Sequence, residues 1–334
     1  MHLFELTRRL IDIESITPNE HAVADFLFES LHELAIQFDG QAERMPVEPG
    51  RDNLFVRFGE PAVVLSTHMD TVPPFIPSRE DETHIWGRGA CDTKGIIAAM
   101  ISAVAELLAA GKRNFGLLFV VGEERNSAGA LAAAKNPRGS KFLVNGEPTD
   151  NKLALASKGA LRYQIVARGR MAHSAYPELG ESAIEKLLEA LNRIRQLKLP
   201  TDPLLGASTL NIGRIEGGRA PNVVADEAFA EILVRVVDDA TELREKIEKL
   251  AAPDANAEQV LLIPAVRLGS LEGFETTVVA FTTDIPAFNG AWGKPFLVGP
   301  GSIHVAHTAE ERIPKDQLIE AVALYKTLVE RLSH

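Results

Sequence analysis

The sequence predicts an α/β fold: a mostly parallel catalytic sheet covered by helices, interrupted by an inserted ferredoxin-like α+β lid. Over the first 160 residues, continuous apolar runs alternate with helical segments, as in parallel sheets that are buried on both faces. Between residues 161 and 269 the strands alternate apolar and polar residues, which is typical of a sheet with one open face. We therefore expect a discontinuous catalytic domain of residues 1–160 and 270–334, interrupted by an inserted lid domain of residues 161–269.

The catalytic part is expected to combine helices with buried strands. Thr17-Pro18-Asn19-Glu20 matches a capping box with proline at the first helical position, so we expect a helix from here to about residue 34. Small apolar residues at helical spacing predict a second helix over 95–110, which Gly111 would end. The apolar runs expected to form strands are 62–66, 115–121 and a third that begins at 141–144. Pro and Gly residues at 46–50 predict a turn.

The lid is expected to follow the order strand, helix, strand, strand, helix, strand, which is that of a ferredoxin-like module. Its strands are predicted at 161–167, 208–216, 227–237 and 260–266. Its helices are predicted at 182–197 and 241–250. The chain then returns to the catalytic domain with a short strand at 296–298 and a long helix at 316–332.

The composition indicates an ordinary globular protein, neither disordered nor fibrous. The chain has 334 residues, of which 46% are hydrophobic and 24% charged, as in ordinary two-domain proteins. Its formal net charge of −11 argues against nucleic acid as a partner, because phosphates require clustered lysine and arginine. The single cysteine, Cys91, suits a reducing compartment. We find neither an apolar run near the roughly 20 residues of a membrane span nor a signal-peptide pattern, so we expect a cytoplasmic protein.

Acidic and histidine residues occur in five short phrases, the first four of which follow, or lie beside, an apolar run that predicts a buried strand. These are STHMDTVPP (66–74), GRGACDTKG (87–95), VVGEERNSAG (120–129), NGEPTD (145–150) and GPGSIHVAHTAEE (299–311). The carboxyl ends of parallel strands meet at one edge of a sheet, where the sites of open α/β folds form. Carboxylates are costly to bury there unless they are paired or bind metal. The phrases therefore predict a metal site for hydrolysis.

The individual residues suit such a site. His68 and Asp70 alternate in an extended segment and so share a face, where the carboxylate can orient the imidazole. Asp92 lies in a glycine-rich loop, and its two oxygens could bridge two cations. Glu123 and Glu124 are adjacent and cannot both face the same way, so one can bind metal while the other faces the substrate water.

The five phrases resemble those of the M20 family of co-catalytic zinc peptidases and deacylases, especially the branch with acetylornithine deacetylase and succinyl-diaminopimelate desuccinylase. The resemblance implies that His68, Asp92 and Glu147 hold one metal ion. It implies that Asp92, Glu124 and His307 hold the other, and that the peptide bond after Asp92 is cis. Zinc suits this mixed site best, although cobalt or manganese would suit it too.

The resemblance also implies the catalytic roles. A hydroxide bridging the two metals would attack the amide, with Glu123 as general base and Asp70 orienting His68. His173, in GRMAHSAYPELG (169–180), would stabilise the oxyanion in the neighbouring subunit's site, so a homodimer through the lid is expected. The residues expected to contact substrate are Asn222, Arg235, Gly301, Ser302 and Lys158.

The expected activity is removal of the acyl group from an N-acyl amino acid, with N-acetylornithine, and thus arginine biosynthesis, as the best single guess. A dipeptidase or carboxypeptidase using the same metals is the alternative that the sequence leaves open. A non-enzymatic dimeric binding protein is a further alternative, but it would be expected to lack Glu123 or a ligand. His304 lies three residues before His307 and is the open alternative for that ligand position.

Overall fold

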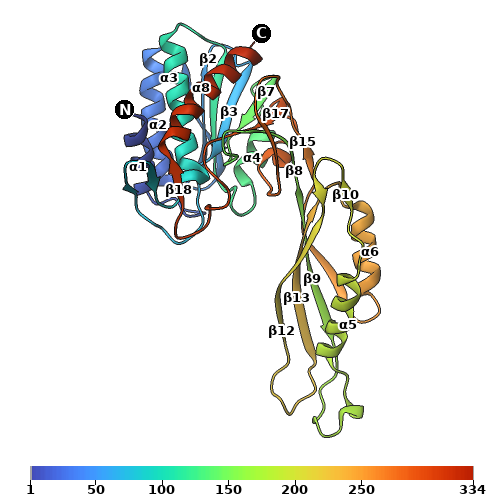
Figure 1. The fold of residues 1–334 in the computed structure, drawn as a ribbon. Helices are drawn as coiled ribbons and strands as arrows, with labels where there is room; N and C mark the ends of the chain where they lie inside the picture. Colours follow the sequence, from blue (N-terminus) through green and yellow to red (C-terminus); the bar gives the residue numbers. More distant parts are fainter. Residues whose placement is uncertain (1, 334) are drawn as a thin grey trace. The chain divides into compact units, whose positions relative to one another are not determined.

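The computed structural model describes residues 2–333, which form two compact units (Figure 1). The first unit comprises Met1–Leu155, Leu268–Thr277 and Thr283–His334, so it contains both ends of the chain. The second comprises Ala156–Arg267 and Val278–Thr282. Strands β8 (Leu153–Ser157) and β16 (Thr276–Val279) carry the chain from one unit to the other, and β15 (Val266–Arg267) pairs with β8.

The first unit is built on a six-stranded sheet in the order β1-β2-β6-β3-β7-β17. Strands β6, β3, β7 and β17 are parallel to one another, while β1, β2 and β6 pair antiparallel. The mostly parallel sheet is as predicted. The strands are β1 (Gln41–Glu48), β2 (Arg51–Phe58), β3 (Val63–His68), β6 (Phe115–Val120), β7 (Phe142–Asn145) and β17 (Lys294–Leu297).

The hairpin of β1 and β2 was not predicted. Its first strand contains Pro46, which suggested a turn, but β1 lies at the edge of the sheet, where proline is tolerated. The turn itself is shorter than predicted and centres on Pro49 and Gly50.

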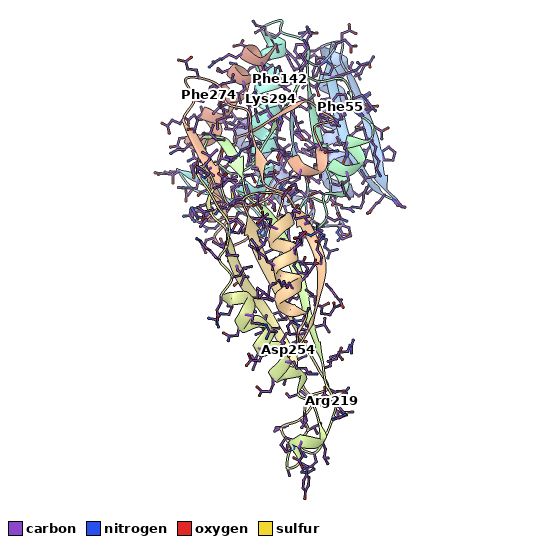
Figure 2. All side chains as sticks on the ribbon, turned by 90° about the vertical axis from the view of Figure 1, so that its right-hand side faces the viewer. Phe55, Phe142, Arg219, Asp254, Phe274 and Lys294 are labelled. Atoms are coloured by element: carbon purple, nitrogen blue, oxygen red, sulfur yellow. The ribbon has the colours of Figure 1, made fainter. Side chains whose placement is uncertain are left out.

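Helices cover both faces of this sheet (Figure 1), as the continuous apolar strands predicted. Helices α1, α2, α3 and α8 pack against one face, and α4 and α7 against the other. The side chains of Phe55 (labelled in Figure 2) and Val64 point to the second face, where they pack with Trp292. The helices are α1 (Leu3–Asp12), α2 (His21–Gln37), α3 (Gly95–Ala109), α4 (Ala128–Ala134), α7 (Ile285–Phe288) and α8 (Lys315–Leu332).

The predicted capping box at residues 17–20 is wrong. Helix α2 begins at His21, no side chain caps it, and it extends to Gln37. The Thr17 hydroxyl instead donates to Oδ2 of Asp70 at 2.6 Å. Glu20 is fully buried and pairs with both Nε and Nη2 of Arg51. Both residues of the expected box are therefore used in tertiary contacts.

The second unit has a four-stranded antiparallel sheet in the order β12-β13-β9-β14, with α5 and α6 on one face. The predicted strand and helix order is confirmed, and the Ser182 hydroxyl caps α5 by accepting from the Glu185 backbone N–H at 3.3 Å. Arg193 of α5 pairs with Asp254 (labelled in Figure 2), which follows α6. The elements are β9 (Gly159–Arg168), α5 (Ala183–Arg195), β12 (Thr209–Gly217), β13 (Glu227–Val236), α6 (Thr241–Ala251) and β14 (Asn256–Ile263).

Small elements complete the chain. Strands β4 (Arg79–Glu80), β5 (His84–Trp86) and β18 (Arg312–Pro314) form a three-stranded sheet in the first unit, and β10 (Thr201–Asp202) pairs with β11 (Gly206–Ala207) in the second. Among residues 2–333 we find no helix with the length and hydropathy needed to cross a bilayer.

Candidate metal centre

Four parallel strands bring four of the five phrases to one edge of the large sheet, and the fifth, 87–95, lies before α3 (Gly95–Ala109). Strand β3 ends at His68, and β6 is followed after two residues by Glu123 and Glu124. Strand β7 leads into Glu147, and β17 leads into the loop that carries His307. Because these strands are parallel, their carboxyl ends meet, which places residues far apart in sequence together.

Asp92 lies between two imidazoles. Nε2 of His68 is 3.0 Å from Oδ1 of Asp92, and Nε2 of His307 is 3.2 Å from Oδ2 of the same carboxylate. Nε2 of His307 is also 3.1 Å from Oε1 of Glu124. Ligand atoms of His68, Asp92 and Glu124 all lie within 4.8 Å of one another. Each oxygen of Asp92 therefore faces its own histidine, which is the arrangement a bridging ligand needs.

Glu147 provides an independent test of whether this cluster fits metal ions. Its side chain is 4% exposed, and no donor in the described part of the chain reaches Oε1. Burial raises the pKa of Glu147 well above its usual range. A buried carboxylate oxygen without a donor is costly unless a cation compensates it. The donor set of two imidazoles and several carboxylates thus fits divalent cations such as zinc.

Without cations, this edge of the sheet holds several buried carboxylates whose ionisation is unfavourable. Burial raises the pKa of both Glu123 and Glu124. Burial also opposes ionisation of Asp92, but hydrogen bonds with His307 and His68 hold its pKa below the usual range. Hydrogen bonds with Asp92 and Glu124 raise the pKa of His307 to about 10. Divalent cations would stabilise the ionised carboxylates and displace the proton from the imidazoles.

Asp70 makes hydrogen bonds that position several residues of the cluster. Nδ1 of His68 lies 3.0 Å from the Asp70 carbonyl oxygen and 3.4 Å from its Oδ1. Because a carbonyl can only accept, Nδ1 carries a proton, and Nε2, which faces Oδ1 of Asp92, is the nitrogen whose proton a bound cation would displace. The Asp70 carboxylate also accepts the backbone N–H groups of Glu123 and Glu124, each at 3.1 Å. The sequence predicted the first role of Asp70 but not the second.

The cis peptide bond implied by the resemblance is present between Asp92 and Thr93. The Thr93 hydroxyl donates to the His68 carbonyl oxygen at 2.7 Å and so ties the Asp92 loop to the end of β3. Both histidines of the phrase that ends at Glu311 are exposed, but the structure brings Nε2 of His307 to 3.2 Å from Oδ2 of Asp92, whereas no described acid lies within ion-pair distance of His304. The geometry therefore favours His307 for the ligand position.

One buried acid near the cluster was not predicted. Asp284, just before α7, is 1% exposed, and neither carboxylate oxygen makes a well-formed hydrogen bond to a described residue, although the nearby Ser127 side chain favours its ionised form. Burial raises the pKa of Asp284 to about 7, and its charge acts on Glu123 and Glu147. A single aspartate before Ile-Pro suggests only an ordinary helix start, so the sequence contained no usable signal for it.

Two of the expected substrate-binding residues lie in the first unit, near the 145–151 loop. Gly301 has φ of +87°, and a side chain there would meet Cβ of Cys91 at 2.5 Å. Its N–H donates to Oε1 of Gln317 at 2.7 Å and is therefore engaged within the chain. Ser302 is half-buried and forms an isolated bridge with Thr149.

The other expected residues lie in the second unit. The segments of His173 and Asn222 are adjacent, because His173 bridges Val223 and the Ser174 N–H donates to the Asn222 carbonyl oxygen at 3.0 Å. Both side chains are exposed. Arg219, at the end of this unit in Figure 2, lines the same shallow groove as Ser174.

Arg235 lies near the opposite end of β13, and its side chain has no ion pair or hydrogen bond to any residue from 2 to 333. Burial lowers the pKa of its guanidinium. Lys158, at the start of β9, donates to the Ala207 carbonyl oxygen at 2.5 Å. Among residues 2–333, neither Arg235 nor Lys158 has an acidic partner, and the Arg235 guanidinium lacks a hydrogen bond as well.

Comparisons with known proteins agree with this geometry. The family described as Peptidase family M20/M25/M40 matches residues 64–331. The Peptidase M20 domain-containing protein C757.05c of Schizosaccharomyces pombe is 39% identical over 338 residues, covering 98% of this chain and 84% of the relative. A probable carboxypeptidase of Aspergillus terreus is 36% identical over 368 residues, covering 97% and 84%. The structure of aminopeptidase PepT from Bacillus cereus has the same fold, with a TM-score of 0.80 and 21% identity over 99% of this chain and 98% of that one.

Proposed function

The chain belongs to the M20/M25/M40 peptidase family and is thus a metal-dependent hydrolase of amide bonds, and we propose that it acts as a carboxypeptidase or dipeptidase that releases the C-terminal residue of short peptides. The observation that carries this proposal is the cluster in which Asp92 lies between His68 and His307. The choice of peptides rests on the probable carboxypeptidase that is 36% identical over nearly the whole chain. This favours the alternative that the sequence left open over the N-acyl amino acid deacylase.

We assign His68, Asp92 and Glu147 to one divalent cation and Asp92, Glu124 and His307 to the other, with zinc as the best-suited metal. When bound, such a pair polarises the scissile carbonyl and lowers the pKa of water. The chain's own part is to hold the ligands. Asp70 keeps the proton on Nδ1 of His68 and fixes the Glu123–Glu124 backbone in place.

Glu123 is the general base in this proposal. Its neighbour Glu124 is used by His307, whereas the Glu123 side chain has no hydrogen bond to a described residue. Burial raises the pKa of Glu123, which brings its proton affinity closer to that of a base working near neutral pH. Glu123 would accept the proton of the attacking water and deliver it to the leaving amine.

Arg235 is the candidate for binding the substrate's C-terminal carboxylate. Its guanidinium is partly desolvated and has no acidic partner in the described chain, so an incoming carboxylate would supply the missing charge. A C-terminal carboxylate occurs in peptides and in N-acyl amino acids alike. Arg235 therefore supports an amino-acid leaving group without identifying what lies on the other side of the bond.

The positions of His173 and Asn222 support the proposed homodimer. They lie near the Glu227 end of β13, while Arg235 lies at the other end, eight steps of about 3.3 Å or about 26 Å away. One substrate of ordinary size cannot reach both ends within one unit. In a dimer with one active site in each subunit, His173 could act as an oxyanion donor in one site while Arg235 binds a substrate carboxylate in the other.

A substrate panel tests the activity. The purified chain would be stripped with chelator, restored with zinc or cobalt, and assayed for released amine. The substrates would be dipeptides, N-blocked dipeptides, N-acetylornithine and N-succinyl amino acids, with Glu123→Gln as the background control. Metal-dependent release of C-terminal residues from N-blocked peptides would support a carboxypeptidase, and release from free dipeptides alone a dipeptidase. Cleavage restricted to N-acetyl or N-succinyl amino acids would overturn the proposal in favour of a deacylase.

A further inference from the structure

A buried ion pair lies directly beside the ligand cluster but contributes no ligand to it. Nη1 of Arg88 is 2.5 Å from Oε2 of Glu311, and the two residues are 2% and 1% exposed. A buried pair is weak evidence of a stabilising role, because desolvating both charges offsets much of their attraction. The position of the Arg88–Glu311 pair beside the ligand cluster therefore needs another explanation.

The second oxygen of Glu311 contacts the backbone of the candidate bridging ligand. Oε1 of Glu311 accepts the backbone N–H of Asp92 at 3.3 Å and lies 3.8 Å from the sulfur of Cys91. One carboxylate therefore joins a buried cation, through one oxygen, to the peptide that presents Asp92, through the other. This contact fixes the position of the Asp92 backbone N–H.

The same carboxylate is part of the loop that carries His307, four residues before Glu311. The Gly87 N–H donates to the Glu311 carbonyl oxygen at 3.0 Å, and β18 continues this contact by pairing with β5. Glu311 therefore holds the loops of Asp92 and His307 against one another.

Arg88 extends the connection to a third segment. Its backbone N–H donates to the Ile76 carbonyl oxygen at 3.0 Å, and its Nε donates to the Pro74 carbonyl oxygen at 3.3 Å. Residues 74–76 continue the phrase that begins with His68 and Asp70. Three of the five phrases thus meet at the Arg88–Glu311 pair.

We propose that Glu311, held by Arg88, is a positioning residue that sets the spacing between Asp92 and His307 required to bind two divalent cations. The carboxylate is suited to this task because it must accept from a guanidinium and a backbone N–H at once. Glutamine has the same shape, but only one of its two terminal atoms can accept a hydrogen bond. The inference rests on the proposed function only in that the cluster binds divalent cations.

The experiment is a cobalt titration of the chelated full chain, followed by absorption of the bound ion, in wild type and in Glu311→Gln. We expect the variant to bind cobalt about 10- to 100-fold more weakly, as is usual when the support of a ligand is removed, and with an altered absorption band. The matched control is Glu20→Gln, which disturbs a second buried Arg–Glu pair among residues 2–333, that with Arg51, without touching a candidate ligand. The control should bind cobalt as wild type does, although its melting temperature falls.

Cobalt binding by Glu311→Gln within about twofold of wild type, with an unchanged band, would overturn the positioning role. If Glu311→Gln does not fold, the same cobalt titration is made with Arg88→Lys. Lysine keeps the positive charge but lacks the planar guanidinium, which donates to both Glu311 and Pro74. Weaker cobalt binding by Arg88→Lys supports the role, and wild-type binding overturns it. A wild-type chain that binds no cobalt would contradict the proposed function itself, so the two failures are distinguishable.

Discussion

Replacing Asp284 with asparagine should stabilise the metal-free protein, and the gain should grow as the pH rises. In the folded chain burial raises the pKa of Asp284 from 3.8 to about 7. The folded state therefore holds this proton more tightly than the unfolded state does. Its stability is complete below the unfolded pKa and falls as the pH rises towards the folded pKa. Three pKa units correspond to about 4 kcal/mol of free energy of unfolding at most, and asparagine cannot ionise and avoids this loss.

The assay is urea unfolding of chelated wild type and Asp284→Asn at about pH 5.5 and about pH 8. Over this interval the difference in free energy of unfolding between the two proteins should increase by about 2 kcal/mol, in favour of the variant. Adding zinc should shrink the difference, because nearby cations stabilise the wild-type carboxylate. Glu60→Gln, whose acid is 88% exposed, serves as the control and should show no such trend. Parallel pH profiles for wild type and Asp284→Asn would refute the argument that Asp284 is buried without compensation.

Three further predictions concern the candidate site and the core. Glu123→Gln should keep the wild-type metal content and lower kcat by roughly 10²- to 10⁴-fold, as measured by metal analysis and steady-state kinetics; wild-type kcat would exclude Glu123 as the base. His307→Ala should weaken cobalt binding by about a hundredfold or more, whereas His304→Ala should leave it unchanged, and the reverse pattern in a cobalt titration would exchange their roles. Trp292→Phe removes the buried hydrogen bond, 2.9 Å long, that Nε1 donates to the Ala133 carbonyl oxygen. In urea unfolding this should lower the free energy of unfolding by about 1–3 kcal/mol. An unchanged unfolding midpoint would mean that water replaces the donor.

Local patterns in the sequence were sufficient to predict most of the elements. The buried strands β3, β6 and β7 appear as continuous apolar runs, and the alternation along β13 marks a sheet with one face covered by α5 and α6. The amphipathic pattern over 182–197 predicted α5, and the structure adds the cap at Ser182, a contact between residues close in sequence. Local rules failed at Thr17 and Glu20, where partners distant in sequence, Asp70 and Arg51, displaced the expected cap.

The same distinction between local patterns and long-range contacts applies to the candidate site. The sequence by itself determined which residues can take part, because four phrases at strand ends and one glycine-rich loop carry the imidazoles and carboxylates that metal chemistry requires. Only the tertiary structure decided how they are used: that His307 rather than His304 meets Asp92, that Asp284 is buried beside the acids, and that Glu311 supports the Asp92 backbone. Glu311 and Asp92 are 219 residues apart in the chain. Patterns of 2 and 3.6 residues report which side of an element is buried, whereas such long-range contacts depend on how separate elements pack together.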